Sequence, residues 1–125
     1  MTPLGAKLRD LRRQRGVTMK HMADAIGVSP AYLSALEHGR RGTPTFDLIQ
    51  RFISYFNIIW DDADELNRLV QISNPRVVVD TAGLSPQATE VANLLARTIS
   101  SLNSEEITHI AAILKAPARK PRFGR

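Results

Sequence analysis

Residues 18–41 read TMKHMADAIGVSPAYLSALEHGRR. Two short segments with the apolar spacing of a helix lie on either side of Gly27 in this stretch. Thr18 precedes the first segment and Ser29-Pro30 precedes the second. A hydroxyl side chain caps a helix N-terminus, and proline suits the first helical position because it has no N–H to lose. The stretch therefore predicts two consecutive helices, over residues 19–26 and 30–37.

The turn between these helices has small residues where the two helices must approach each other. Ala23 and Gly27 lie four residues apart, and glycine accepts the positive φ that the turn needs. Val28, Leu33 and Leu36 can then seat the second helix on its neighbours. Its outer face then consists of Pro30, Ala31, Tyr32, Ser34 and Ala35, and all of these except Tyr32 are small. We call an outer face made mostly of small side chains lean. A helix with such a face can enter a DNA major groove, which is about 12 Å wide.

Three more helices flank this pair in the first part of the chain. Leu4, Leu8 and Leu11 follow a helical period, and Gly16 ends that helix. A fourth helix begins at Thr43 or Thr45, around Pro44, and a fifth begins near Asp61, with Leu66, Leu69 and Val70 packing. The fourth helix is expected to present five apolar residues inward: Phe46, Ile49, Phe52, Ile53 and Phe56.

The second part of the chain is predicted to be a linker and two further helices. Asn74-Pro75 stops the helical pattern, and Val77–Val79 is expected to be extended. One idea is that this segment pairs with the same segment of a second copy of the chain and forms a two-stranded ribbon. Ser85-Pro86 opens a helix to about Leu102, and Ser104 starts a last one. The predicted fold class is all-α, divided into a five-helix domain 1–72, an extended linker 73–83, a helical dimerisation region 84–115 and a basic disordered tail 116–125.

Composition and charge point to a soluble protein with a polyanionic partner. The chain has 125 residues and a net charge of +5, and it contains no cysteine, which excludes a disulfide scaffold and cysteine-ligated metal. Its longest apolar-looking stretch, residues 52–60, is far shorter than the roughly 20 residues that span a bilayer. Residues 1–42 carry eight basic and three acidic side chains, and residues 116–125 carry four basic and no acidic ones. Two separated basic regions favour nucleic acid.

The chain resembles the phage-repressor-like helix-turn-helix regulators, also called the Cro/C1 or XRE type, over about residues 3–72. The matching residues are Gly16-Val17-Thr18, Ala23, Ile26-Gly27-Val28-Ser29, Tyr32-Leu33-Ser34, Leu36-Glu37-His38-Gly39-Arg40-Arg41 and Pro44. The resemblance implies a five-helix Cro/C1-type domain and a sequence-specific, DNA-binding transcriptional regulator, such as a repressor. Such a protein would bind double-stranded DNA in the cytoplasm, at the bacterial nucleoid.

The resemblance also implies which residues carry the function. The helix Pro30–Glu37 would be the recognition helix, and Arg12 with Glu37 would form a structural ion pair. His38, Arg40 and Arg41 would follow the DNA backbone or enter the minor groove. The expected DNA-binding residues are Thr18, Met19, Lys20, Ser29, Pro30, Ala31, Tyr32, Ser34, Ala35, His38, Arg40, Arg41 and Thr43.

Two features depart from the family pattern. Family members commonly have glutamine at the position of Met19 and glutamate near His21, where the acid completes a capping box. The recognition helix also lacks the Gln, Asn or Arg that makes bidentate contacts to bases. We therefore expect phosphates and DNA shape to supply much of the affinity.

The last two predicted helices have broad apolar faces. Leu94 and Leu95 are adjacent on the helix and cannot both face the same neighbour, so at least two packing partners are needed. A second copy of the chain would supply one of them and would match a palindromic DNA site. The expected dimer interface consists of Val91, Leu94, Leu95, Ile99, Leu102, Ile107, Ile110 and Leu114. The alternative is an autoregulating antitoxin-type protein whose C-terminal helices bind a partner protein.

The sequence offers no candidate for catalysis, a cofactor, a metal or a small-molecule ligand. His21, His38 and His109 fall in separate elements and lack ligand spacing. The acidic residues between Asp61 and Glu65 are explained by the positive end of a helix rather than by a divalent cation. No Ser-His-Asp arrangement and no glycine-rich phosphate loop is present, so an enzyme is not expected.

Overall fold

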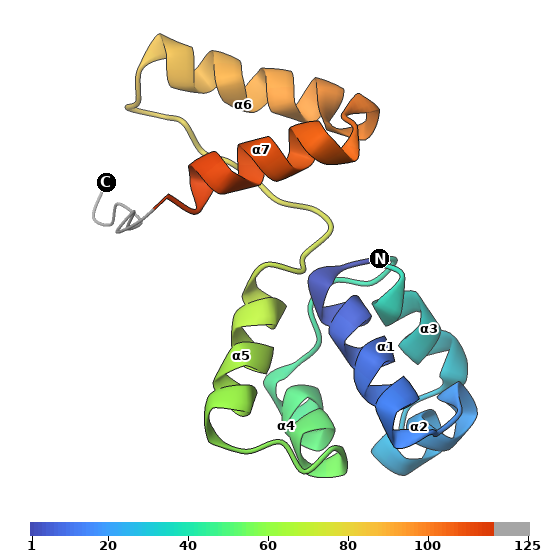
Figure 1. The fold of residues 1–125 in the computed structure, drawn as a ribbon. Coiled ribbons are helices and arrows are strands. Elements are labelled where there is room, and N and C mark those ends of the chain that lie inside the picture. Colours follow the sequence, from blue (N-terminus) through green and yellow to red (C-terminus); the bar gives the residue numbers. More distant parts are fainter. Residues whose placement is uncertain (117–125) are drawn as a thin grey trace. The chain divides into compact units, whose positions relative to one another are not determined.

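The computed structural model describes residues 1–116 and shows two compact units. The N-terminal unit comprises residues 1–77, and the C-terminal unit starts at residue 78. Within the described part of the chain every regular element is helical, which confirms the all-α prediction (Figure 1). Of the basic tail 116–125 that is predicted to be disordered, residues 117–125 lie outside the described residues.

The N-terminal unit consists of five helices whose starts are set by local chemistry. They are α1 (Pro3–Arg15), α2 (Met19–Ile26), α3 (Pro30–Glu37), α4 (Phe46–Tyr55) and α5 (Trp60–Gln71). In the first four, the hydroxyl before the helix accepts a hydrogen bond from a backbone N–H in the first turn; the capping residues are Thr2, Thr18, Ser29 and Thr45. Of the two threonines predicted to cap α4, Thr45 is therefore the one that does so. α5 begins at Trp60 without a side-chain cap.

Glycines end the first two helices, as predicted. Gly16 follows α1 with a φ of 73°, and Gly27 follows α2 with a φ of 90°. Both angles lie in the left-handed region that glycine enters without steric cost. The sharp turn at Gly27 lets α3 leave α2 at once, and Val28 N–H donates to the carbonyl of Ala23 across it.

The core of the N-terminal unit lies between the five helices. Its buried apolar residues are Leu4, Leu8, Met22, Ala23, Ile26, Leu33, Leu36, Leu48, Ile49, Phe52 and Leu66. Every helix contributes at least one of them, so no helix of this unit can be removed without exposing apolar surface. Ser73, just after α5, is also buried, and its hydroxyl accepts a 2.8 Å hydrogen bond from Leu4 N–H. This bond ties the end of the unit to its beginning.

One prediction about the core is wrong. Phe46 is predicted to face inward, but its side chain is 75% exposed. It is the first residue of α4, and it lies about 200° around the helix from Leu48, which is buried. The inward stripe of α4 is formed by Leu48, Ile49 and Phe52 instead. Ile53 and Phe56 are half-buried against the core.

The C-terminal unit consists of α6 (Pro86–Thr98), the short 3₁₀ helix η1 (Ile99–Ser101) and α7 (Ser104–Leu114). α6 ends earlier than predicted, because the chain tightens into η1 before Leu102. α7 is capped by Asn103, whose side chain accepts from Glu106 N–H while the Glu106 carboxylate accepts from Asn103 N–H. The two helices run in opposite directions (Figure 1). No described residue of this unit is buried.

A close helix contact in the N-terminal unit involves Gly5 of α1 and the last residue of α3. A Cβ atom placed on Gly5 would lie 2.7 Å from Glu37 Cα and 2.8 Å from its carbonyl carbon. Real Cβ atoms do not approach backbone atoms so closely, so only glycine permits α1 to rest on α3 here. This requirement could not be recognised from the sequence, because it depends on the backbone of a residue 32 positions away.

We expect Gly5→Ala to destabilise the N-terminal unit. Alanine favours a helix over glycine by about 1 kcal/mol, but forcing two backbones apart costs about 1–3 kcal/mol or more. The net expectation is a lower urea midpoint in denaturation followed by circular dichroism. Gly42→Ala is the matched control, because a Cβ there meets nothing within 4 Å. Equal midpoints for the two variants would contradict the close approach.

Candidate nucleic-acid interface

The inner face of α3 is held by the core, which fixes the direction of its outer face. Leu33, Leu36 and Glu37 are buried. Of the five residues predicted to face outward, Pro30 and Ala31 are exposed, while Tyr32, Ser34 and Ala35 are half-buried. The side chains in the middle of the outer face are therefore partly covered by their neighbours, and those at its N-terminal end are the most exposed to solvent.

The N-termini of α2 and α3 expose the polar residues that the sequence placed there. Thr18, Lys20 and Ser29 are exposed, but Met19 is half-buried and packs against the core. Thr18 and Ser29 are each engaged by a backbone N–H, at 3.0 Å in both cases. The backbone N–H groups of a helix start attract anions, and Lys20 adds a positive charge beside the start of α2.

The loop after α3 brings three cationic or potentially cationic side chains close to that helix. His38 ends α3, and its Nδ1 lies 2.8 Å from the carbonyl oxygen of Ser34. Gly39 turns the chain with a φ of 75°, and Arg40 N–H donates back to the carbonyl of Ala35. His38, Arg40, Arg41 and Thr43 are all exposed.

Arg41 also contacts α3 directly. Its guanidinium carbon lies 5.4 Å from the centre of the Tyr32 ring, within the range of a cation–π contact. Tyr32 is half-buried and Arg41 is exposed, so the ring, which is partly held by its neighbours, supports the arginine. The structure thus brings together two residues that the sequence had placed in the interface for separate reasons.

Arg12 and Glu37 lie next to each other beneath this surface. Arg12 Nη2 is 3.5 Å from Glu37 Oε1, and the side chains are 17% and 1% exposed. A carboxylate buried this deeply would be costly without a positive partner. Because α1 supplies the arginine and α3 supplies the acid, the pair joins the two helices that also meet at Gly5.

Sequence reasoning did not single out Arg51, which borders the N-terminus of α3. Arg51 of α4 donates to the carbonyl of Ile26 at 3.2 Å and pairs with Asp47 at 2.9 Å. A hollow of about 390 Å³ lies beside it, lined by Val28, Ser29, Tyr32, Thr45, Asp47, Leu48 and Arg51. A basic residue one turn after an acid on a helix usually indicates a surface pair, so nothing in the sequence pointed to the contact with α2.

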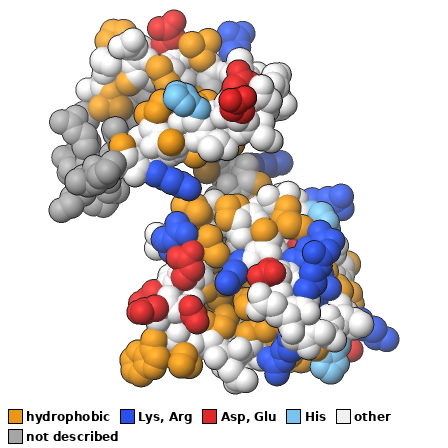
Figure 2. Space-filling view, in the orientation of Figure 1, with side chains coloured by type: hydrophobic (Ala, Val, Ile, Leu, Met, Phe, Trp, Pro, Cys, Tyr) orange, Lys and Arg blue, Asp and Glu red, His pale blue; other side chains and the backbone are white. Residues whose placement is uncertain are grey.

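The charges of the N-terminal unit are divided between its helices. On the face that Figure 2 shows, basic side chains gather over α1 and α3, whereas acidic ones lie over α5. Asp61, Asp62 and Asp64 of α5 are exposed. Hydrogen bonds from Arg68 lower the pKa of the exposed Glu65 carboxyl on the same helix. A polyanion would be drawn to the α1 and α3 side and repelled from α5.

A comparison with protein families bears on this arrangement. The family model of the helix-turn-helix domain matches residues 3–69, which is more than half of the chain. The chain belongs to the XRE-type helix-turn-helix family. The matched region ends within α5, so the family domain and the five-helix N-terminal unit nearly coincide. The resemblance read from residues 3–72 is confirmed.

Three curated proteins are similar to the chain. The HTH-type transcriptional regulator RghRB of Bacillus subtilis is 36% identical over 62 residues, 50% of this chain and 45% of that protein. The HTH-type regulator DdrOP3 of Deinococcus deserti is 39% identical over 56 residues, 45% of this chain and 43% of that protein. The HTH-type repressor RghR of Bacillus subtilis is 34% identical over 61 residues, 49% of this chain and 45% of that protein. The matches thus span somewhat under half the length of each relative. No solved structure matches the chain significantly.

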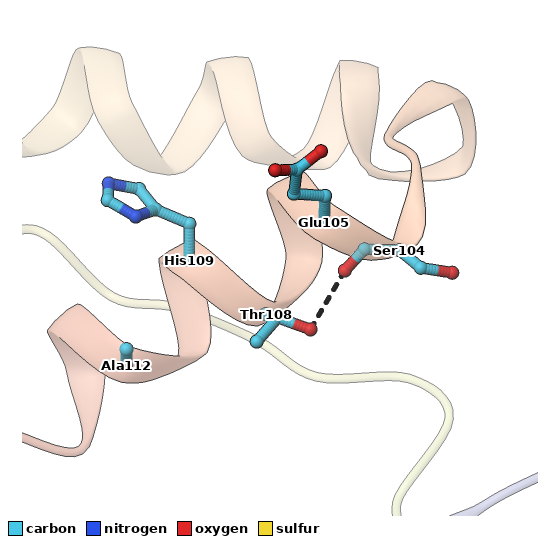
Figure 3. A pocket seen from close by; sticks show the side chains of 5 residues that line it. All are labelled: Ser104, Glu105, Thr108, His109 and Ala112. Carbon is cyan, nitrogen blue, oxygen red and sulfur yellow. Dashed lines mark hydrogen bonds between the residues drawn. The ribbon is translucent and has the colours of Figure 1, made fainter.

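The described residues contain no cluster of three metal-binding side chains, and none of their helices has the length and apolarity to cross a membrane. A hollow away from the family domain runs along α7 and is lined by Ser104, Glu105, Thr108, His109 and Ala112 (Figure 3). All five residues belong to one helix, and the only bond drawn among them joins the Thr108 hydroxyl to the Ser104 carbonyl, at 2.9 Å. The hollow is therefore one side of a helix rather than an enclosed site.

The residues predicted to form a dimer interface all lie in the C-terminal unit. Five of them are exposed: Val91, Leu94, Ile99, Ile107 and Leu114. The other three, Leu95, Leu102 and Ile110, are half-buried. Leu94 and Leu95 are the adjacent residues from which we predicted two packing partners. Leu95 is half-buried, whereas Leu94 is exposed to solvent. Val77–Val79 is exposed and forms no strand.

We expect Arg12→Met to destabilise the family domain by about 3 kcal/mol, because it leaves the Glu37 carboxylate buried without its partner. The double variant Arg12→Met, Glu37→Met should recover most of this loss, since an apolar pair can replace a buried ion pair at little cost. Urea denaturation of the four chains of this double-mutant cycle measures the coupling. If the loss in free energy of unfolding of the double variant equals the sum of the losses of the two single variants, the two side chains do not interact.

Proposed function

We propose that this chain is a DNA-binding transcriptional regulator that inserts α3 into the major groove. The observation that carries the proposal is the combination of a lean outer face on α3 with exposed arginines directly after it. Small side chains on this face let the helix backbone come close to the base edges. The open end at Pro30 and Ala31 is the part that we expect to approach the bases most closely.

The chemistry of this face favours limited direct base recognition. Methyl groups of alanine and the hydroxyl of Ser34 can contact thymine methyls and base edges, but they make no bidentate hydrogen bonds. Discrimination would then depend in part on the sequence-dependent shape of the duplex. Affinity would depend on phosphate contacts, for which the starts of α2 and α3 and the loop arginines are placed.

Arg40 and Arg41 have distinct expected roles. Arg41 lies over the ring of Tyr32, which holds its guanidinium near the recognition helix. Arg40 is exposed, and its backbone N–H is bonded to Ala35 of α3, so its position follows that helix. We assign Arg41 to the sugar–phosphate backbone beside α3 and Arg40 to the backbone or the adjoining minor groove.

We further propose that the chain acts as a homodimer on an inverted repeat. One lean helix reads only a few base pairs, whereas two copies related by a two-fold axis read two half-sites. The exposed apolar residues of α6 and α7 support a partner for the C-terminal unit. Repression is the output we favour, because the name of the relative RghR describes a repressor. Its place of action would be the cytoplasm, where bacterial DNA lies.

We expect Arg40→Ala and Arg41→Ala each to weaken DNA binding and to flatten its salt dependence. Removing one phosphate contact should reduce the slope of log K against log salt by about one unit. Fluorescence anisotropy with a labelled duplex, recovered by selection from random sequences, measures both quantities. Arg68→Ala is the matched control, because Arg68 lies on the acidic α5 and pairs with Glu65.

An unchanged slope in both loop variants would contradict the proposed interface. The selected duplexes provide a separate check on symmetry, since a two-fold dimer requires an inverted repeat with a fixed distance between half-sites. A recovered site without such a repeat would argue against the dimer but not against DNA binding itself.

A further inference from the structure

The outward face of α6 is an apolar stripe with opposite charges at its two ends. Val91 is 58% exposed and Leu94 is 50% exposed. Glu90 and Arg97 are exposed as well, and neither forms an ion pair with another residue in the described part of the chain. Ala92 lies about 160° around the helix from Leu94 and Leu95 about 100° from it, and both are half-buried. Leu94 therefore points away from the residues of α6 that pack within the unit, whereas Val91 borders them.

Helix geometry places Glu90, Leu94 and Arg97 in one row. At 3.6 residues per turn, Glu90 lies about 40° and Arg97 about 60° from Leu94, both on the same side of it. The acid is one turn before the leucine, and the arginine is one turn after it. The order acid, leucine, base along a helix is complementary to itself when the direction of the second helix is reversed.

The C-terminal unit needs a partner of some kind. α6 and α7 contain 13 and 11 residues, and isolated helices of this length are marginal in water. None of their described side chains is buried, so the unit has no core of its own to offset the ordering of its chain. Apolar burial must be supplied from outside the unit.

We propose that α6 packs antiparallel against α6 of a second copy, with the two-fold axis passing close to Leu94. Glu90 of each copy then faces Arg97 of the other, and this contact forms twice. The inference deepens the homodimer of the proposed function by assigning its interface and its orientation. A parallel pair would instead place Glu90 level with Glu90 and Arg97 level with Arg97, and like charges would oppose it.

The second copy fits this face better than an unrelated protein would, because the face supplies its own charge complement. A two-fold interface requires one surface to match itself, and the row from Glu90 to Arg97 meets that condition. Leu94 and Val91 would supply the apolar burial. The exposed ion pairs would add little energy each, and their main effect would be to select the antiparallel orientation.

Cross-linking tests the position of the axis. Because the chain has no cysteine, Leu94→Cys introduces a single thiol that can be linked only to another copy. We expect a short bis-maleimide to convert most of this variant to a covalent dimer at micromolar concentration. Thr108→Cys, at an exposed site on α7, is the matched control and should remain largely monomeric (Figure 3). Equal yields from the two variants, or no dimer from the first, would overturn the proposal.

Charge exchange tests the orientation. Glu90→Arg and Arg97→Glu should each weaken dimerisation of the full chain by about tenfold, because each puts like charges opposite each other twice. The double exchange Glu90→Arg, Arg97→Glu restores the opposite pairs and should return the dimerisation constant to near its original value. Glu105→Arg on α7 is the control for a reversal outside the stripe. Sedimentation velocity gives the constants, and circular dichroism checks that helicity is retained.

A failure to recover in the double exchange would overturn the antiparallel contact. A full chain that stays monomeric at high concentration would also overturn it. In that case α6 would be covered by the N-terminal unit or by a different protein instead of a second copy. Neither result would remove the proposed DNA binding, because one copy can still bind a single half-site. The salt slope on a half-site duplex therefore separates failure of the dimer contact from failure of the proposed function.

Discussion

The close contact between α1 and the end of α3 is the constraint on which the proposed DNA-binding surface depends. Gly5 lets the backbone of α1 rest on that of Glu37, and Arg12 of the same helix reaches the buried Glu37 carboxylate at 3.5 Å. One residue of α3 is thus held by its backbone and by its side chain. A helix of eight residues has little stability alone, so this contact and the apolar side of α3 decide where the helix lies.

The features of the candidate interface follow from this placement. Glu37 is immediately followed by His38 and by the turn at Gly39, so the loop arginines start from a fixed point. Tyr32 lies on the same short helix and contacts Arg41. The outer face of α3 and the positive loop are therefore both attached to a helix that is packed on its neighbours. A surface ordered in this way suits recognition that depends on the shape of the duplex, because less ordering is needed when DNA binds.

Local chemistry explains which parts of this structure could be predicted from the sequence. The starts of α2 and α3 were predictable because Thr18 and Ser29 act within one turn, and the glycine at 27 ends α2 by its own backbone preference. The prediction for Phe46 is wrong, since a first-turn residue can satisfy the apolar period and still point to solvent. The roles of Gly5, Ser73 and Arg51 could not be predicted because they depend on distant backbone groups. The family resemblance, by contrast, was recoverable from residue types and their spacing.

The central claim is that α3 and the loop after it form the surface that meets DNA. The most direct measurement is a titration of the ¹⁵N-labelled full chain with duplex DNA, followed by amide chemical shifts. We predict the largest changes at residues 29–35, at 38–43 and at the start of α2, with little change in α5. Changes confined to α5 or to the C-terminal unit, or a spectrum unaltered by any duplex at low salt, would contradict the account.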